Sequence, residues 1–139
     1  MADEELVRMI REQGTDGLKE WGQQNPGEVP DLESAILMGA NLESAILREV
    51  ILRGADLAVA DLRGADLWGA DLREAILRGA NLWEADLAGA DLWGAKVTAE
   101  QLAEAADLTN AIMPDGTKWE PGGPWDRRGQ VEELSLIHI

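Results

Sequence analysis

The sequence predicts an all-β solenoid, in which the backbone winds repeatedly around a core of aliphatic side chains. Leucine recurs at every fifth position from Leu32 to Leu92, and Val97 takes the next place. Alanine stands two residues before almost every leucine, and aspartate or asparagine usually stands between them. An α-helix, at 3.6 residues per turn, would spread leucines of period five around its whole circumference. A repeat of this regularity decides the fold before any other feature.

The five-residue unit itself indicates how the chain turns. Alanine and leucine are two residues apart, so in a short extended segment both side chains point to one side, and the residues next to leucine point to the other. The fifth residue, often glycine, can then turn the corner. Successive coils would stack through backbone hydrogen bonds at about 4.8 Å. The predicted core positions of the repeats are Leu37, Leu42, Leu47, Leu52, Leu57, Leu62, Leu67, Leu72, Leu77, Leu82, Leu87 and Leu92.

Several units resemble the A(D/N)LXX unit of the pentapeptide-repeat family. Examples are Ala40-Asn41-Leu42 and Ala65-Asp66-Leu67-Trp68-Gly69, and the resemblance covers about half of the chain. It implies a right-handed quadrilateral β-helix with four units in each coil. Between residues 30 and 97 this gives about 3.5 coils, with short helical caps at both ends.

On a four-sided coil, residues twenty apart form columns on the outer walls. An arginine stands twenty residues before each of three outward tryptophans. We therefore expect guanidinium planes to lie on indole rings, a contact that contributes about 0.5–1 kcal/mol where it is exposed. The pairs are Arg48 with Trp68, Arg63 with Trp83 and Arg73 with Trp93.

The segments that flank the repeats predict caps, which a solenoid needs over its open ends. Residues 1–29 are predicted to form an N-terminal helical cap, amphipathic over 3–24 and interrupted at Gly14. Residues 30–97 form the β-helix, and residues 98–119 form a C-terminal helical cap and return turn. Gln101 follows Thr98 by three positions, which predicts a capping box that opens a helix running through about Ala106.

The remaining residues, 120–139, are predicted to be a disordered tail, because their first half is rich in glycine and proline. The segment 134–139, Leu-Ser-Leu-Ile-His-Ile, resembles the translation of a transposon mosaic-end sequence. We therefore expect this segment to derive from an adapter, and the natural chain to continue differently after about Glu133. His138, the one histidine, then carries no functional information.

The composition excludes several classes of function. The chain has no cysteine and one histidine, so it offers no thiolate or histidine metal site and no cysteine nucleophile. Serine occurs only at Ser34, Ser44 and Ser135, which leaves no plausible Ser-His-acid set. We expect no catalytic residue, no metal and no cofactor. The formal net charge of −15 opposes nucleic-acid binding through phosphates.

The expected setting is the bacterial cytoplasm, without membrane contact. The acidic N-terminus leads into no apolar signal region. No run approaches the roughly 20 apolar residues of a membrane span.

The outward acids and tryptophans make up the candidate interaction surface. The acids have a structural interpretation, because a short polar side chain at this position can bond to nearby backbone. The tryptophans either stack on arginine or mark a protein contact. The members are Trp68, Trp83, Trp93, Asp66, Asp71, Asp86 and Asp91.

Four outward isoleucines depart from the preference for aspartate or asparagine. They predict a mildly apolar region that serves self-association, contacts the N-terminal segment or is simply tolerated. The four are Ile36, Ile46, Ile51 and Ile76.

The expected function is a non-enzymatic scaffold whose walls bind a protein partner, because a leucine-filled solenoid offers no interior cavity. The resemblance implies an alternative, an acidic mimic of duplex DNA that binds a type II topoisomerase such as gyrase. The charge distribution disfavours this alternative, since residues 30–97 hold 12 acidic and 6 basic side chains. The coils would rise roughly 17 Å, over which B-DNA carries on the order of 10 charges.

Overall fold

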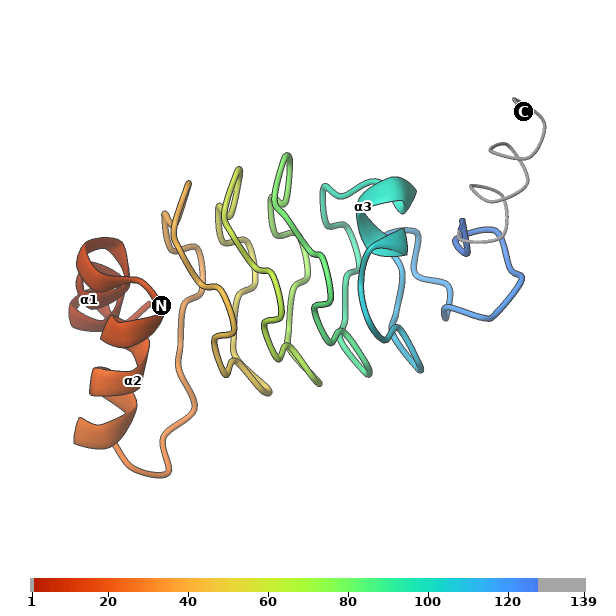
Figure 1. The fold of residues 1–139 in the computed structure, drawn as a ribbon. Helices are drawn as coiled ribbons and strands as arrows, with labels where there is room; N and C mark the ends of the chain where they lie inside the picture. The colour runs from red at the N-terminus through yellow and green to blue at the C-terminus, as the bar shows by residue number, and fades with distance from the viewer. Residues whose placement is uncertain (1, 128–139) are drawn as a thin grey trace.

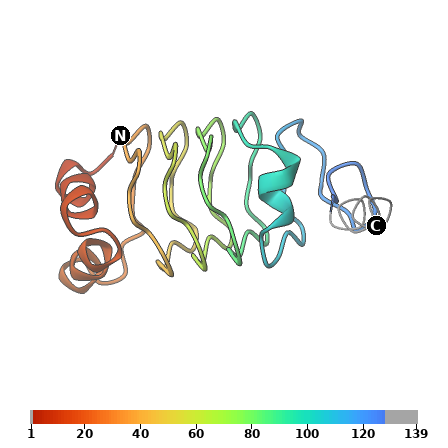
Figure 2. The ribbon, with the colours of Figure 1, turned by 45° about the horizontal axis from the view of Figure 1, so that its top comes forward.

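Successive coils of the repeat lie between a pair of helices and a short C-terminal helix (Figure 1). The structure is a computed structural model that describes residues 2–127. Its helices are α1 (Glu4–Gln13), α2 (Thr15–Gln24) and α3 (Ala99–Ala103). Figure 2 shows α1 and α2 covering one end of the stack, with α3 near the other.

Backbone hydrogen bonds join the coils at one constant register. Through the repeats, isolated parallel bridges connect residues twenty apart, such as Asp56 with Ile76, so each coil holds four five-residue units. The N–H of Leu62 donates to the carbonyl of Asn81, nineteen residues later, at 2.9 Å, and the same pattern holds at every repeat leucine from Leu32 to Leu77. Each side of a coil is so short that residues 2–127 contain bridges and no continuous strand. The repeats therefore form a β-helical solenoid.

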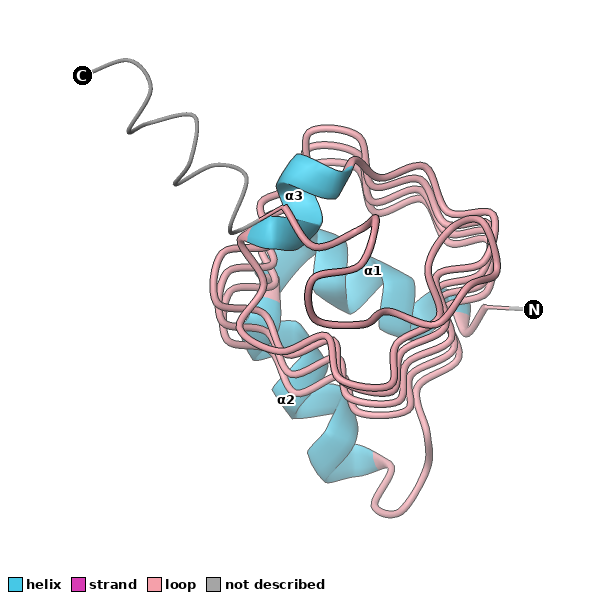
Figure 3. Cartoon of the chain, turned by 90° about the vertical axis from the view of Figure 1, so that its right-hand side faces the viewer, coloured by secondary structure: helices cyan, strands magenta, loops and turns pink. Residues whose placement is uncertain are grey.

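The leucines and alanines of the repeat fill the inside of the coils. The predicted core leucines, from Leu37 to Leu92, are each 1% exposed or less, and the alanines two residues before them are buried as well. Figure 3, which looks along the stack, shows the coils superposed into a four-cornered outline around this interior. Burying one leucine side chain contributes roughly 1.5–3 kcal/mol, so the core supplies most of the driving force.

The N-terminal cap consists of the two short helices that the sequence predicts. Asp3 begins α1 by accepting the N–H groups of Glu5 and Leu6, and α1 buries its apolar face against the first coil. Gly14 separates the helices at φ 58°, where a Cβ atom would come within 2.4 Å of the carbonyl oxygen of Asn41. Only glycine fits this approach. The hydroxyl of Thr15 then donates to the carbonyl of Glu43, at 2.9 Å, and fastens α2 to the coil.

The C-terminal cap contains the predicted capping box between Thr98 and Gln101. The Gln101 side chain also donates to two wall carbonyls, those of Leu77 at 2.6 Å and Ala80 at 3.0 Å. The prediction that this helix reaches Ala106 is wrong, because α3 ends at Ala103. The N–H of Ala106 instead donates to the carbonyl of Ala85, at 2.8 Å, which returns the chain to the wall.

The chain after α3 adds further wall to the solenoid. Asp107 and Ile112 bridge to Asp86 and Asp91, now twenty-one residues away, so the α3 segment inserts one extra residue into the register. Within residues 120–127, assigned from the sequence to a disordered tail, residues 121–125 form turns and a bend in this structure. The rest of that tail, including the adapter-like segment 134–139, lies outside the described residues.

The corners of the coil require left-handed backbone at the fifth residue of each unit. Glycine occupies many of these positions, such as Gly64 at φ 65° and Gly79 at φ 69°. Val59 has the same conformation, at φ 59°, although its side chain branches at Cβ. A β-branched residue in this region is strained by about 1–3 kcal/mol, and Val59 gains little burial in return because it is 65% exposed.

We therefore expect the Val59→Gly variant to be more stable than the natural chain by about 1 kcal/mol, because glycine adopts this conformation without strain. Urea unfolding followed by circular dichroism would measure the change. Ala58→Gly is the matched control at the preceding residue of the same corner, where φ is not positive. It should lower stability by about 0.5–1 kcal/mol. Equal effects of the two substitutions would contradict the assignment of strain to Val59.

Candidate interaction surface

Outward-facing aspartate or asparagine side chains form a hydrogen bond to the backbone at most corners of the coil. In each such unit the side-chain oxygen accepts the N–H of the residue two positions later, which no backbone carbonyl reaches. Asp91 accepts the N–H of Trp93 at 3.0 Å, and Asp86 accepts that of Ala88 at 2.9 Å. The backbone bond expected for this position is therefore present. The residues that make it within the wall are Asp31, Asn41, Asp56, Asp61, Asp66, Asp71, Asn81, Asp86, Asp91 and Asp107.

The seven candidate residues lie on two adjacent sides of the coil and at three successive corners. Asp66 bridges to Asp86 on one side, and Asp71 bridges to Asp91 on the next. Trp68 lies at the corner between these sides and is 43% exposed. The structure thus brings the predicted residues together as one surface, called here the acidic surface: Trp68, Trp83, Trp93, Asp66, Asp71, Asp86 and Asp91.

The other two tryptophans bound the acidic surface. Trp83 follows Leu82 at the corner before the side of Asp86, and it is 57% exposed. Trp93 follows Leu92 at the corner after the side of Asp91, and it is 51% exposed. Both indoles are therefore largely open to solvent.

Arginines neutralise the half of the acidic surface nearer the N-terminal end. Arg48 pairs with Asp66 through its Nε atom. Arg73 forms a two-point ion pair with Asp71, in which Nε donates to Oδ1 at 2.8 Å and Nη2 donates to Oδ2 at 2.7 Å. Such two-point pairs fix geometry as well as charge.

The predicted stacking of arginine on tryptophan is confirmed at one of the three pairs. Arg48 lies over the Trp68 ring, 5.8 Å from its centroid. The stacking predicted for Arg63 on Trp83 and for Arg73 on Trp93 is wrong among the residues that the structure describes.

The cause lies within each repeat unit, where the arginine meets a carboxylate two residues before it. Arg63 binds Asp61 at 2.8 and 2.9 Å, and its Nη2 atom also reaches Glu43 at 3.3 Å. A two-point ion pair is stronger than an exposed cation–π contact of about 0.5–1 kcal/mol. The guanidinium of Arg73 likewise pairs with Asp71 instead of stacking on the Trp93 ring. Trp83 and Trp93 are left without the arginine contact that would explain their exposure.

These ion pairs shift the acid–base behaviour of the carboxylates. The hydrogen bond from Arg73 holds the pKa of Asp71 below its ordinary value, although partial burial acts in the opposite direction. The hydrogen bond from Arg63 lowers the pKa of Asp61 in the same way. Both aspartates therefore remain charged into more acidic solution than a free carboxylate would.

The half of the acidic surface nearer the C-terminal end carries two half-buried carboxylates that form no ion pair in the described part of the chain. Asp86 and Asp91 accept backbone N–H groups, and within residues 2–127 neither has a cation within ion-pair distance. Trp83 and Trp93 lie at the two corners beside them. Uncompensated carboxylates flanked by exposed indoles can receive a basic segment that carries apolar side chains.

No group of three or more histidine, cysteine, aspartate or glutamate side chains in residues 2–127 is arranged to hold a metal ion. The helices there are too short and too polar for any of them to traverse a lipid bilayer.

Comparison with known families and structures gives a consistent match to the repeats. The family model described as pentapeptide repeats matches residues 31–58 and 55–94, in eight copies. No curated protein matches the chain.

Three solved structures illustrate the similarity. A pentapeptide repeat protein from the thylakoid lumen of Arabidopsis thaliana is 32% identical over 60% of this chain and 54% of its own length, with a TM-score of 0.49. One from the cyanobacterium Cyanothece 51142 is 40% identical over 65% of this chain and 57% of its own, with a TM-score of 0.48. One from Nostoc PCC 7120 is 36% identical over 60% of this chain and 74% of its own, with a TM-score of 0.36. The chain thus spans little more than half of the first two.

The Arg73–Asp71 pair predicts a specific dependence on pH. Because the pKa of Asp71 is lowered in the folded state, the pair stabilises the fold above the ordinary carboxylate pKa of about 3.9. The stabilisation is lost as the pH falls through the lowered pKa. In the Arg73→Gln variant we expect the pKa of Asp71 to rise toward its ordinary value, measured by NMR titration of the carboxyl carbon.

The stability difference between Arg73→Gln and the natural chain should accordingly be present near neutral pH and vanish in strong acid. Arg78→Gln is the matched control, because Arg78 is not among the groups that shift Asp71. An Asp71 pKa that is the same in Arg73→Gln and in the natural chain would contradict the assigned cause.

Proposed function

The chain belongs to the pentapeptide-repeat family, and on that basis we propose that it is a non-enzymatic scaffold that binds a protein partner on the acidic surface. The proposal includes the finer fold that the family implies, a right-handed quadrilateral β-helix of about 3.5 coils. A solenoid whose interior is filled by leucine offers its outer walls for recognition, so binding has to occur there.

The exposure of Trp83 and Trp93 is the observation that supports this proposal most. Each indole is more than half exposed, and neither has the arginine contact that would make it part of the wall. Tryptophans of this kind are frequent anchors of protein interfaces, where a few aromatic residues supply most of the binding energy. They frame the two carboxylates of Asp86 and Asp91, which remain uncompensated.

The charge of the acidic surface determines the chemistry of the partner. Two half-buried carboxylates without an ion pair, set between two exposed indoles, favour a basic segment. Its lysine or arginine side chains would meet Asp86 and Asp91 while its apolar side chains cover the rings. The steering contribution of the charges should weaken as salt increases.

The DNA-mimic alternative is less well supported by the same contacts. A mimic needs a regular row of uncompensated negative charges, as on the duplex itself. Here Asp61, Asp66 and Asp71 are each paired with an arginine. The remaining uncompensated acids on the wall are too few to reproduce the charge of a duplex.

The test uses a fluorescently labelled synthetic helix of lysine and leucine, titrated with the whole chain and followed by anisotropy. We expect the Asp86→Asn/Asp91→Asn variant to bind it at least tenfold more weakly, since charge is lost while an asparagine oxygen still accepts the corner N–H. Trp83→Ala/Trp93→Ala should weaken binding similarly. Asp56→Asn is the matched control, because Asp56 makes the same corner bond on another side.

Unchanged affinity in both double variants would contradict the assignment of the acidic surface. A DNA-supercoiling assay with a purified type II topoisomerase tests the alternative separately. Inhibition at low micromolar concentrations of the chain would support the DNA mimic and overturn the proposed scaffold.

A further inference from the structure

A second surface lies on the side of the coil opposite to Asp66 and Asp86. The bridges run in one column from Ile36 through Asp56 and Ile76 to Lys96, two units away along each coil from the Asp66 column. With four units in a coil, two units apart means opposite sides. The corner after this column adds further exposed apolar side chains. We call this the basic-apolar surface: Arg11, Ile36, Met38, Val59, Ile76, Arg78 and Lys96.

The isoleucines of this column have no structural advantage at their positions. Where most units place aspartate or asparagine, Ile36 and Ile76 provide no oxygen for the corner N–H. The N–H groups of Met38 and Arg78 accordingly have no hydrogen-bond partner within the described chain. Ile36 is also 61% exposed and Ile76 is half-buried, so burial compensates little at Ile36 and only in part at Ile76. At Ile36 and Ile76 the column therefore lacks the side-chain hydrogen bond to the corner N–H and carries an apolar side chain instead.

Three cations on or beside this side are not held by carboxylates of the described chain. Arg11, Arg78 and Lys96 make no ion pair within residues 2–127, whereas Arg48 and Arg73 are both paired. In a chain with a net charge of −15, three unpaired cations thus lie near Ile36, which is exposed, and Ile76, which is half-buried. The acid in the middle of the column is Asp56, whose Oδ1 atom is engaged by the N–H of Ala58.

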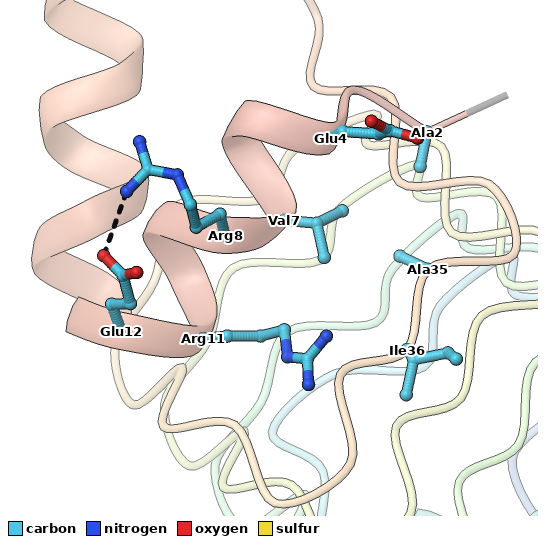
Figure 4. Close-up of a pocket in the computed structure, with 8 residues that line it drawn as sticks. All are labelled: Ala2, Glu4, Val7, Arg8, Arg11, Glu12, Ala35 and Ile36. Carbon is cyan, nitrogen blue, oxygen red and sulfur yellow. Dashed lines mark hydrogen bonds and ion pairs between the residues drawn. The ribbon is translucent and has the colours of Figure 1, made fainter.

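A groove extends this surface onto the N-terminal cap. A cavity of about 550 Å³ lies between α1 and the first coil, and Val7, Ala35 and Ile36 form its apolar part. Figure 4 shows the Arg11 side chain extending from α1 toward the groove on the side of Ile36, while Arg8 points away to Glu12. The Arg8–Glu12 pair, at 3.0 Å, is already satisfied. Arg11 is therefore the free cation at the edge of the groove.

We propose that the basic-apolar surface binds an acidic amphipathic helix of a partner protein, laid along the column from the groove beside α1 to Lys96. Two coils separate Ile36 from Ile76, about 10 Å at the usual spacing between strands. Apolar side chains seven positions apart on a helix are separated by a similar distance, about 10.5 Å. Carboxylates beside them would meet Arg11, Arg78 and Lys96. The scaffold would then hold two partners of opposite charge, one on the side of Ile36 and Ile76 and one on the two sides of the acidic surface.

The experiment titrates the whole chain against a labelled synthetic 18-residue helix of leucine and glutamate, followed by anisotropy. The decisive variant is Ile36→Asn/Ile76→Asn. It removes the apolar side chains and supplies the missing corner oxygen, so its urea midpoint should not fall below that of the natural chain. We expect it to bind the glutamate peptide at least tenfold more weakly.

Ile46→Asn is the matched control. It makes the same chemical change at an isoleucine that is 69% exposed, against 61% for Ile36, on the side of the coil that carries Asp66. It should leave the affinity for the glutamate peptide within twofold. Arg78→Gln/Lys96→Gln should weaken binding severalfold, and the effect should shrink at high salt.

Absence of binding by the glutamate peptide, an unchanged affinity in Ile36→Asn/Ile76→Asn, or an equal loss in Ile46→Asn would each overturn the proposal. The lysine–leucine peptide separates this surface from the acidic one, because Ile36→Asn/Ile76→Asn should leave its affinity unchanged. Failure of one proposal therefore leaves the other measurable.

Discussion

The structure depends on satisfying every backbone N–H of a five-residue unit at a constant twenty-residue register. In the unit 60–64, the N–H of Ala60 closes a turn on Leu57, that of Asp61 donates to the preceding coil, and those of Leu62 and Gly64 donate to the following coil. The N–H of Arg63 donates to the Asp61 side chain at 3.1 Å. Alanine and leucine face the core, aspartate or asparagine completes the bonding, and a residue that tolerates positive φ turns the corner. The five-residue sequence repeat therefore follows from this hydrogen-bonding requirement.

Function is confined to the outward positions that this requirement leaves free. Where aspartate completes a corner, its second oxygen and its charge remain available, as at Asp86 and Asp91. Where isoleucine replaces it, as at Ile36, the unit loses one bond and displays an apolar side chain. The acidic surface and the basic-apolar surface thus differ because some units have aspartate at the corner-bonding position and others have isoleucine. Each wall presents side chains at a spacing fixed by the coil, which gives a rigid surface for recognition.

Periodicity predicted most of the fold because a buried position leaves little choice. The core leucines, the break at Gly14 and the capping box of Thr98 all follow from local rules that the structure keeps. The outer contacts were less predictable, since a twenty-residue column brings Arg63 near Trp83 but does not decide which neighbour its guanidinium takes. The guanidinium of Arg63 binds Asp61, two residues away in the same unit, through a two-point ion pair. The helix α3 ends earlier than the sequence predicts, because the hydrogen bond from Ala106 to Ala85 in the wall is a tertiary contact that the local sequence does not reveal.

The most direct test of this account is an NMR experiment that detects scalar couplings across hydrogen bonds. Such couplings identify the donor nitrogen and the acceptor carbonyl of each bond without reference to any assumed fold. Four units in each coil predict that the nitrogen of each repeat leucine from Leu32 to Leu77 couples to the carbonyl carbon nineteen residues later, as from Leu62 to Asn81. Couplings to carbonyls about fourteen or about twenty-four residues later would instead indicate three or five units in each coil. Either result would contradict the four-sided register from which both surfaces are inferred.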